Sequence, residues 1–137
     1  MPARADIEQV LNRICWGYDE NDVDLIASLF TSDARMSMRI GDRAGELLGP
    51  FLGRDRIRRL HADSLSGQQD QRRHQLTNLW VEQESENAVT VVTNLVLYAV
   101  RDGAVSALST GWYRDRLVHT ADGWQVADRY LYLDLPY

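Results

Sequence analysis

The sequence has few of the residues that build disulfides and metal sites. It contains one cysteine and three histidines in 137 residues. The single cysteine, Cys15, excludes an intrachain disulfide, and its place among apolar positions predicts a small buried side chain, which fits a reducing, cytoplasmic environment. His61, His74 and His119 lie far apart, without the spacing of a zinc site. We therefore predict no metal.

Long apolar runs and cofactor motifs are also missing. No segment is apolar over the roughly 20 residues that a membrane span requires. The opening residues, MPARADIEQV, lack the apolar run of a signal peptide. There is no glycine-rich phosphate loop, no GxSxG elbow and no HExxH motif. We expect no membrane partner and no cofactor, which leaves general acid–base chemistry with a few titratable groups.

An excess of positive charge is absent as well, because the formal net charge is −5. An acidic chain gains nothing by neutralising phosphates, so no nucleic-acid partner is expected. Arginines cluster over residues 54–59 and at Arg72 and Arg73, but acidic neighbours favour a solvated face over a binding patch. With 45% hydrophobic residues, the length suits one domain over residues 1–137.

The first half of the chain has the periodicity of helices. Six apolar side chains over residues 5–18 share one helix face, namely Ile7, Val10, Leu11, Ile14, Cys15 and Tyr18. Asp22 can cap a second helix whose buried face is Leu25, Ile26, Leu29 and Phe30, closed by residues 31–33. We then predict a short strand over 34–40, a loop over 41–53, a third helix over about 54–64 and a loop over 66–73.

The second half is rich in strand-forming residues. Candidate strands over 74–81, 88–100, 104–118 and 124–133 are separated by turn-like segments at 84–87, 101–103 and 120–123. Consecutive long strands with short turns form an antiparallel meander, and helices followed by strands indicate an α+β fold. A strongly twisted sheet covered by helices on its concave face leaves a hollow, the usual kind of small-molecule site.

Two neighbouring residues at the end of the first helix are candidates for chemistry. Tyr18 and Asp19 lie at the C-terminal, negative end of the helix dipole, which would make an ionised Asp19 a stronger base. The alternative is that Asp19 is exposed in a turn while Tyr18 belongs to the core. His74 opens a strand after a polar loop, and it would act as a base only if a carboxylate fixed its tautomer. Asp19 could be that carboxylate.

The last strand contributes Arg129. Strict alternation places Arg129 with Ala127, Leu131 and Leu133, and it places Val126, Asp128, Tyr130 and Tyr132 on the opposite face. An arginine among apolar neighbours is costly to bury without an acceptor. It is therefore either paired with a carboxylate, the safer interpretation, or directed at a ligand oxygen. We interpret His61 and His119 as surface residues.

Three segments carry a family resemblance that runs nearly from end to end. They are GYDENDVDLIASLF (17–30), RRHQLTNLWVE (72–82) and STGWYRDRLVHTADGWQVADRYLYLD (109–134). In their order and spacing they resemble the SnoaL-like, nuclear-transport-factor-2-like superfamily. That resemblance implies a cystatin-like cone, with N-terminal helices packed on a strongly curved, mainly antiparallel sheet around an apolar pocket.

Lyases of this superfamily suggest roles for the candidate residues. The Tyr18–Asp19 turn and His74 resemble the site of scytalone dehydratase. Asp19, His74 and Arg129 are similar to the Asp–His dyad and active-site arginine of hexachlorocyclohexane dehydrochlorinase. Bile-acid 7α-dehydratase is a third lyase with related acid–base groups. What carries over is the dyad, with Tyr18 and Arg129 as helpers.

The chain also departs from these lyases. Near Ile14 the dehydrochlorinase has a lysine. Scytalone dehydratase has a second tyrosine at or beside the position of Met38, and a second histidine where this chain has Tyr98 or Ala99. The substrates of these enzymes therefore do not carry over.

A competing branch is non-catalytic. VVTNLVLYAVRDG (91–103) and the C-terminal segment resemble beta subunits of ring-hydroxylating dioxygenases, which assemble as a trimer under an iron-bearing subunit. This chain is shorter than is usual for them and keeps both Asp19 and His74, which favours an enzyme. A ligand carrier without chemistry is a third possibility.

The leading hypothesis is a cofactor-free lyase or isomerase, resembling a dehydratase. It would act on an apolar small molecule, such as a polyketide, steroid-like, terpenoid or aromatic intermediate. Asp19 would orient His74, His74 would remove a proton, Tyr18 would hydrogen-bond the oxygen that gains charge, and Arg129 would help to hold it. Resemblance alone further implies a homo-oligomer, a trimer before a dimer.

Overall fold

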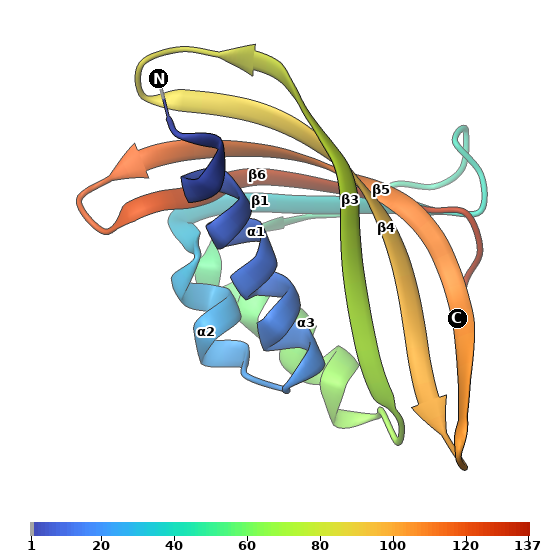
Figure 1. Cartoon of the computed structure of the whole chain (residues 1–137). Helices are drawn as coiled ribbons and strands as arrows, with labels where there is room; N and C mark the ends of the chain where they lie inside the picture. Colours follow the sequence, from blue (N-terminus) through green and yellow to red (C-terminus); the bar gives the residue numbers. More distant parts are fainter. Residues whose placement is uncertain (1) are drawn as a thin grey trace.

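The strands of the protein bend together into one deeply curved sheet, and the helices cover its concave side (Figure 1). The computed structural model describes residues 2–137. Its elements in chain order are α1 (Arg4–Asp19), α2 (Val23–Ser28), β1 (Phe30–Ile40), β2 (Leu48–Leu52), α3 (Arg54–Ser66), β3 (Gln71–Glu84), β4 (Ala88–Arg101), β5 (Ala104–Thr120) and β6 (Gly123–Leu133). The arrangement confirms the α+β order that the residue pattern predicts and the cystatin-like cone that the family resemblance implies.

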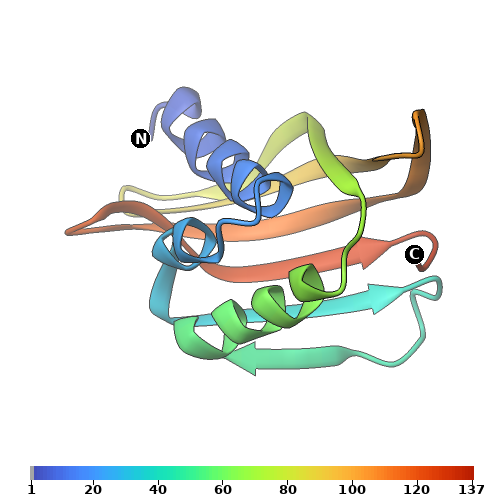
Figure 2. The same cartoon turned by 90° about the horizontal axis from the view of Figure 1, so that it is seen from below.

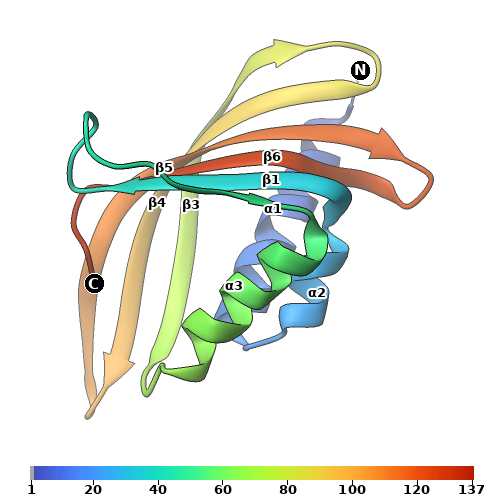
Figure 3. The same cartoon turned by 180° about the vertical axis from the view of Figure 1, so that it is seen from behind.

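The sheet has the strand order β2-β1-β6-β5-β4-β3. The meander β3 to β6 is antiparallel as predicted, and β1 joins it by pairing in parallel with β6. Seen from below, the three helices lie in one layer against the sheet (Figure 2). From behind, α3 runs beneath β1 and β2, while α1 lies farther away (Figure 3). The helices thus close one side of a hollow formed by the curved strands.

The core lies between the helix layer and the concave face of the sheet. The predicted face of α1 is buried, with Ile7, Leu11 and Ile14 at most 2% exposed. Cys15 is buried with them. Complete burial of such an aliphatic side chain is worth about 1.5–3 kcal/mol relative to leaving it exposed. Packing of this face therefore fixes the position of α1, and with it the two polar residues at its end.

The turn from α1 to α2 holds the end of α1 in place. Asp22 caps α2, because its Oδ1 accepts a hydrogen bond from the Leu25 N–H at 3.0 Å. The helices approach so closely that a Cβ at Gly17 would lie 2.6 Å from Ile26 Cγ1. A larger residue at position 17 would push the helices apart. The Tyr18–Asp19 pair is therefore set by a tight helix–helix contact.

Several predicted boundaries are wrong for long-range reasons. Residues 31–33 do not close α2 but belong to β1, because Phe30 already pairs with Val126 of β6. The predicted loop over 41–53 contains the edge strand β2, in which Pro50 is tolerated because an edge strand has one unpaired side. The predicted loop over 66–73 ends early, since β3 begins at Gln71. Pairing with a distant strand decided all of these boundaries.

The arginine clusters are only partly solvated. Arg73 forms an exposed ion pair with Glu20, with 2.8 Å between Nη1 and Oε1. Arg54, by contrast, is half-buried and donates twice to the Phe30 carbonyl oxygen. Arg72 is half-buried beside Asp70. No helix within residues 2–137 is long and apolar enough to cross a membrane.

Candidate active site

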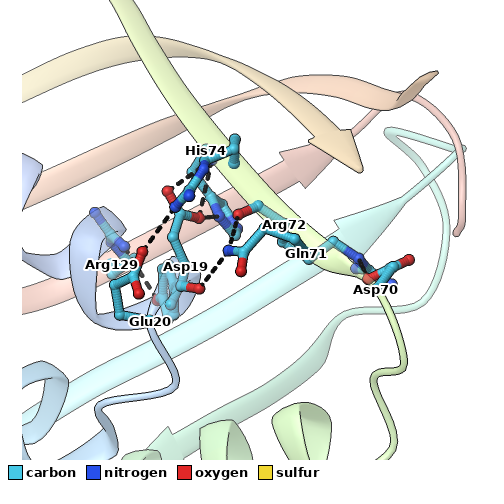
Figure 4. A network of polar contacts seen from close by, with 9 residues as sticks. Asp19, Glu20, Asp70, Gln71, Arg72, His74 and Arg129 are labelled. Carbon is cyan, nitrogen blue, oxygen red and sulfur yellow. Dashed lines mark hydrogen bonds and ion pairs between the residues drawn. The ribbon is translucent and has the colours of Figure 1, made fainter. Parts of the chain in front are cut away.

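Asp19 and His74 meet although 55 positions separate them in the sequence. Asp19 is the last residue of α1, and His74 lies near the start of β3 (Figure 4). His74 Nδ1 is 2.7 Å from Asp19 Oδ1, and the His74 backbone N–H donates to the same carboxylate at 3.0 and 3.2 Å. The end of α1 is thereby fastened to the sheet, and the imidazole ring has a fixed orientation.

This contact determines which nitrogen of His74 is available. An ionised carboxylate can only accept hydrogen bonds, so Nδ1 of the neutral imidazole carries the proton and Nε2 keeps its lone pair. Nε2 has no hydrogen-bond partner within residues 2–137, and His74 lines a cavity. The two side chains are 11% and 9% exposed. Such a histidine can accept a proton at Nε2 while Asp19 stabilises the resulting imidazolium.

Tyr18 lies beside the dyad and lines the same cavity. Its ring centroid is 4.9 Å from that of His74, and its hydroxyl oxygen accepts a hydrogen bond from Arg129 Nη1 at 3.3 Å. Burial raises the pKa of the Tyr18 phenol to about 12, although the charge of Arg129 opposes the rise. Tyr18 is therefore protonated at neutral pH and can donate a hydrogen bond.

Arg129 is paired with a carboxylate, the safer of the two sequence interpretations. Its guanidinium donates to both oxygens of Asp115, at 2.7 and 3.0 Å, and both side chains are fully buried. Burial disfavours charge on Arg129, but Asp115 outweighs it and holds the pKa of Arg129 well above its ordinary value. Arg129 does not line the cavity. It can reach a ligand only through Tyr18.

A bulge places Arg129 among the core residues. β5 and β6 change register between Arg116 and Leu117, so Val126 and Arg129 both end up buried. The strict alternation that set Val126 on the opposite face is therefore wrong. Asp115 was not identified from the sequence, although Tyr113, Asp115 and Leu117 alternate along a strand and all face inward.

His61 is a further site residue that the sequence analysis wrongly assigned to the surface. It is 7% exposed, and its Nε2 lies 3.2 Å from the Tyr18 hydroxyl oxygen. Burial, helped by the charges of Arg129 and His74, lowers its pKa to about 3. Its place one turn after the buried Ile57 on α3 was the signal that could have revealed it. His119 is exposed, in agreement with the prediction.

The cavity beside these groups has a volume of about 260 Å³. Tyr18, His61 and His74 form one polar part of its wall. Most of the remainder is apolar and comes from β1, α3, β5 and β6, including Met36, Met38, Leu60, Tyr113, Leu131 and Leu133. Arg72, with its side chain 14% exposed and paired with Asp70, lies at another part of the wall. The space suits a mostly apolar small molecule that carries an oxygen.

A second cavity, of about 220 Å³, lies between α1 and β3. Its wall is more polar and includes Glu8, Asn12, Asn78 and Thr93. Neither member of the dyad lines it. Over residues 2–137, no three His, Cys, Asp or Glu side chains are grouped as metal ligands. The first cavity is therefore the one that combines a base, a hydrogen-bond donor and apolar walls.

Comparison with known proteins identifies a family. A family model described as a SnoaL-like domain matches residues 1–130. No curated protein sequence matches the chain. A Catenulispora acidiphila protein solved in complex with S-DNPA is similar in structure, with 26% identity, a TM-score of 0.78 and coverage of 95% of this chain and 92% of that one.

Two further solved structures share the fold at lower identity. Aln2 from a Streptomyces species has 20% identity and a TM-score of 0.80, with coverage of 98% of this chain and 94% of that one. A Novosphingobium aromaticivorans protein, described as the beta subunit of a putative aromatic-ring-hydroxylating dioxygenase, has 13% identity and a TM-score of 0.82, with coverage of 98% and 90%. At these identities the likeness shows the fold alone.

Proposed function

The chain belongs to the SnoaL-like domain family, and from that premise we propose that it is a cofactor-free acid–base enzyme, a lyase or isomerase of an apolar small molecule. One observation carries the proposal. His74, which Asp19 holds through Nδ1, lines a mostly apolar cavity, and its Nε2 has no partner in residues 2–137. A purely structural ion pair would have no need of an open nitrogen beside such a space.

The proposed reaction begins with proton removal by His74. Nε2 takes a proton from a carbon next to a carbonyl group, and the C–H electron pair moves to form an enolate. Asp19 keeps the ring in place and stabilises the imidazolium. In an isomerase the same proton returns to another carbon. In a lyase the electron pair instead expels a leaving group on the neighbouring carbon, and His74 or Tyr18 supplies the proton that the group takes with it.

Tyr18 serves the oxygen on which negative charge develops. Its hydroxyl remains protonated and lies beside His74 on the cavity wall. Arg129 donates to the Tyr18 oxygen from behind, which makes the phenol a better hydrogen-bond donor. Arg129 is thus a positioning residue, held by Asp115. General acid–base groups of this kind contribute about 100- to 10,000-fold in rate.

The walls indicate the class of substrate. A cavity of about 260 Å³ with mostly apolar walls suits a fused-ring or similarly compact molecule. The polar groups require one carbonyl or hydroxyl oxygen close to the dyad. Polyketide, steroid-like, terpenoid and aromatic intermediates have these properties. The Catenulispora protein was solved in complex with S-DNPA, which supports ligand binding by this kind of fold.

The test uses a probe ketone rather than the natural substrate. 2-Tetralone is a bicyclic aryl ketone with an acidic C–H group, and incorporation of deuterium from D₂O can be followed by NMR. We expect the wild-type protein to accelerate the exchange above the buffer rate. His74→Gln and Asp19→Asn should each lose on the order of 100-fold or more of that acceleration. His119→Gln, the same substitution at an exposed histidine, is the matched control.

The same experiment separates the alternatives. Exchange at the buffer rate by a folded wild-type protein that binds the ketone would support a ligand carrier and contradict the enzyme. Undiminished exchange by His74→Gln would contradict the proposed base. Co-purification with a larger iron–sulfur protein, together with no exchange, would instead favour a beta-type subunit of a ring-hydroxylating dioxygenase.

Two expectations from the family resemblance complete the proposal. We propose a homo-oligomer, a trimer before a dimer, which light scattering of the purified protein tests. We also propose a cytoplasmic location, which the single buried Cys15 fits. Fractionation of producing cells checks it, and recovery of the protein outside the cytoplasm would contradict it.

A further inference from the structure

His61 contacts the Tyr18 side chain in two ways, through ring packing and through a hydrogen bond. The two rings meet edge to face, with centroids 4.8 Å apart and an interplanar angle of 62°. His61 Nε2 is 3.2 Å from the Tyr18 hydroxyl oxygen, and Arg129 Nη1 approaches the same oxygen at 3.3 Å. The hydroxyl group is therefore held between two nitrogen atoms from two different elements, α3 and β6.

The positions of the protons follow from the donors available. Arg129 can only donate, so the Tyr18 oxygen accepts on that side. The neutral His61 ring has one N–H group, on either Nδ1 or Nε2. A proton on Nδ1 would have no acceptor within residues 2–137, whereas a proton on Nε2 is donated to Tyr18. Tyr18 has one hydroxyl proton, and the proposed function gives that proton to the substrate oxygen, so His61 has to be the donor of this contact and carry its proton on Nε2.

The surroundings also keep His61 uncharged. It is enclosed by α3 and the core, and the guanidinium of Arg129 and the imidazole of His74 are both close enough to oppose a further positive charge. A neutral ring has a single proton to give. The Tyr18 oxygen accepts a hydrogen bond from that proton, so Tyr18 does not donate its own hydroxyl proton to His61.

Resting on the proposed function, we propose that His61 is a positioning residue that donates its Nε2 proton to Tyr18 and so directs the Tyr18 hydroxyl proton into the cavity. The Tyr18 oxygen then accepts two hydrogen bonds, from His61 and Arg129. Both become stronger as the phenol gives up its proton or shares it with a substrate oxygen. His61 thus acts on the substrate only through Tyr18.

The tautomer can be measured directly by ¹⁵N NMR of the side-chain nitrogens. We expect His61 in the wild-type protein to be protonated on Nε2 and not on Nδ1, without change between pH 5 and pH 8. His61→Gln identifies the signals. A proton on Nδ1, or a protonation step of His61 within that pH range, would overturn the assignment. This experiment requires no turnover.

Deuterium exchange into 2-tetralone supplies the second arm. His61→Leu should reduce the exchange rate roughly tenfold, as expected for the loss of one hydrogen bond. His61→Gln, whose side-chain amide can still donate to Tyr18, should retain most of the rate. Because His61 acts through Tyr18, adding His61→Leu to Tyr18→Phe should cause no further loss.

The NMR measurement and the exchange assay together distinguish failure of the His61 proposal from failure of the proposed function. Independent losses in the double variant, or an equal loss in the Gln and Leu variants, would overturn the role of His61. If His61→Leu fails to fold, the Gln variant and the NMR experiment carry the test. If the wild-type protein exchanges no ketone, the proposed function fails, and the NMR experiment still decides the His61 assignment.

Discussion

Two carboxylate pairs of the protein have the same shortest contact and very different surroundings. Asp19–His74 and Asp115–Arg129 both have a nitrogen–oxygen distance of 2.7 Å. Asp115–Arg129 is doubly hydrogen-bonded and fully buried, so its polar atoms are occupied by each other and by Tyr18. His74 lines a cavity, and its Nε2 has no hydrogen-bond partner within residues 2–137. A short ion pair alone therefore does not mark a candidate for chemistry, whereas a free lone pair beside a cavity does.

Tyr18 connects the two pairs. Its ring lies against His74, and its hydroxyl accepts from Arg129. In the proposed mechanism, the buried pair supports the hydrogen-bond donor Tyr18, and the partly exposed pair supplies the base. Changes to the two pairs should therefore differ in their main effect. Changes to Asp115–Arg129 should mainly lower stability, and changes to Asp19–His74 should mainly lower activity.

Breaking the buried pair should give the largest change in stability. Arg129→Met leaves the Asp115 carboxyl buried without its partner, and burial already raises the pKa of this group, so the free energy of unfolding should fall by about 3–5 kcal/mol. The double variant Asp115→Leu/Arg129→Met removes both charges and should recover most of that loss. Urea denaturation measures both. A single variant that loses less than about 1 kcal/mol would show that the pair is not a structural centre.

The pH dependence of stability sharpens the comparison at His61, which lies between the two pairs. Its pKa is lowered to about 3 from 6.5. Between these values the unfolded chain binds a proton that the folded chain does not, so the free energy of unfolding falls as the pH falls through this window. From pH 7.5 to pH 4 the contribution is about 3 kcal/mol.

Carboxylates also titrate in this range, so the comparison is with His61→Gln. The free energy of unfolding of this variant should fall less steeply on acidification than that of the wild type. Urea denaturation over a series of pH values gives the two slopes. Equal slopes would mean that His61 titrates normally and is not buried as a neutral ring.

Filling the cavity tests whether the ligand binds beside His74. Met38 is half-buried on β1 and lines the space beside His74. Met38→Trp should weaken binding of 2-tetralone by about tenfold or more and change the free energy of unfolding by less than about 1 kcal/mol. Calorimetry measures the first and urea denaturation the second. Val105→Trp, at a site 68% exposed, is the control. Unchanged affinity in Met38→Trp would place the ligand elsewhere.

An exposed pair should give the smallest effect. Arg114 and Glu82 are joined at 3.0 and 3.1 Å, but their side chains are 44% and 31% exposed. Glu82→Gln should cost about 0–1 kcal/mol, because water competes for both groups. The loss should also shrink in 1 M salt. A loss as large as that of Arg129→Met would mean that burial does not distinguish the pairs.

The fold was predictable to the extent that it depends on local pattern. The buried face of α1, the Asp22 cap and the long antiparallel strands follow from periodicity, capping and turn residues. The edge strand β2 and the first residues of β1 did not, because distant pairing partners determine them. The glycine-rich segment over 41–53 and the polar residues 31–33 have no local pattern that indicates pairing with another strand.

The site was predictable where a resemblance could bring distant residues together. It suggested the contact between Asp19 and His74, which the structure contains, while the roles of both remain predictions. Asp115 and His61 were missed for different reasons. The pairing of Asp115 with Arg129 depends on a bulge that no local pattern announces. His61 had the spacing of a buried residue on α3, but its polarity suggested the surface.

The most direct test of the central claim is the structure of the protein with 2-tetralone bound. The account predicts the acidic carbon within about 3.5 Å of His74 Nε2, the separation from which proton transfer proceeds, and the ketone oxygen at hydrogen-bond distance from the Tyr18 hydroxyl. A ketone bound in the second cavity between α1 and β3, or one whose oxygen points to Arg72 and away from His74, would contradict it.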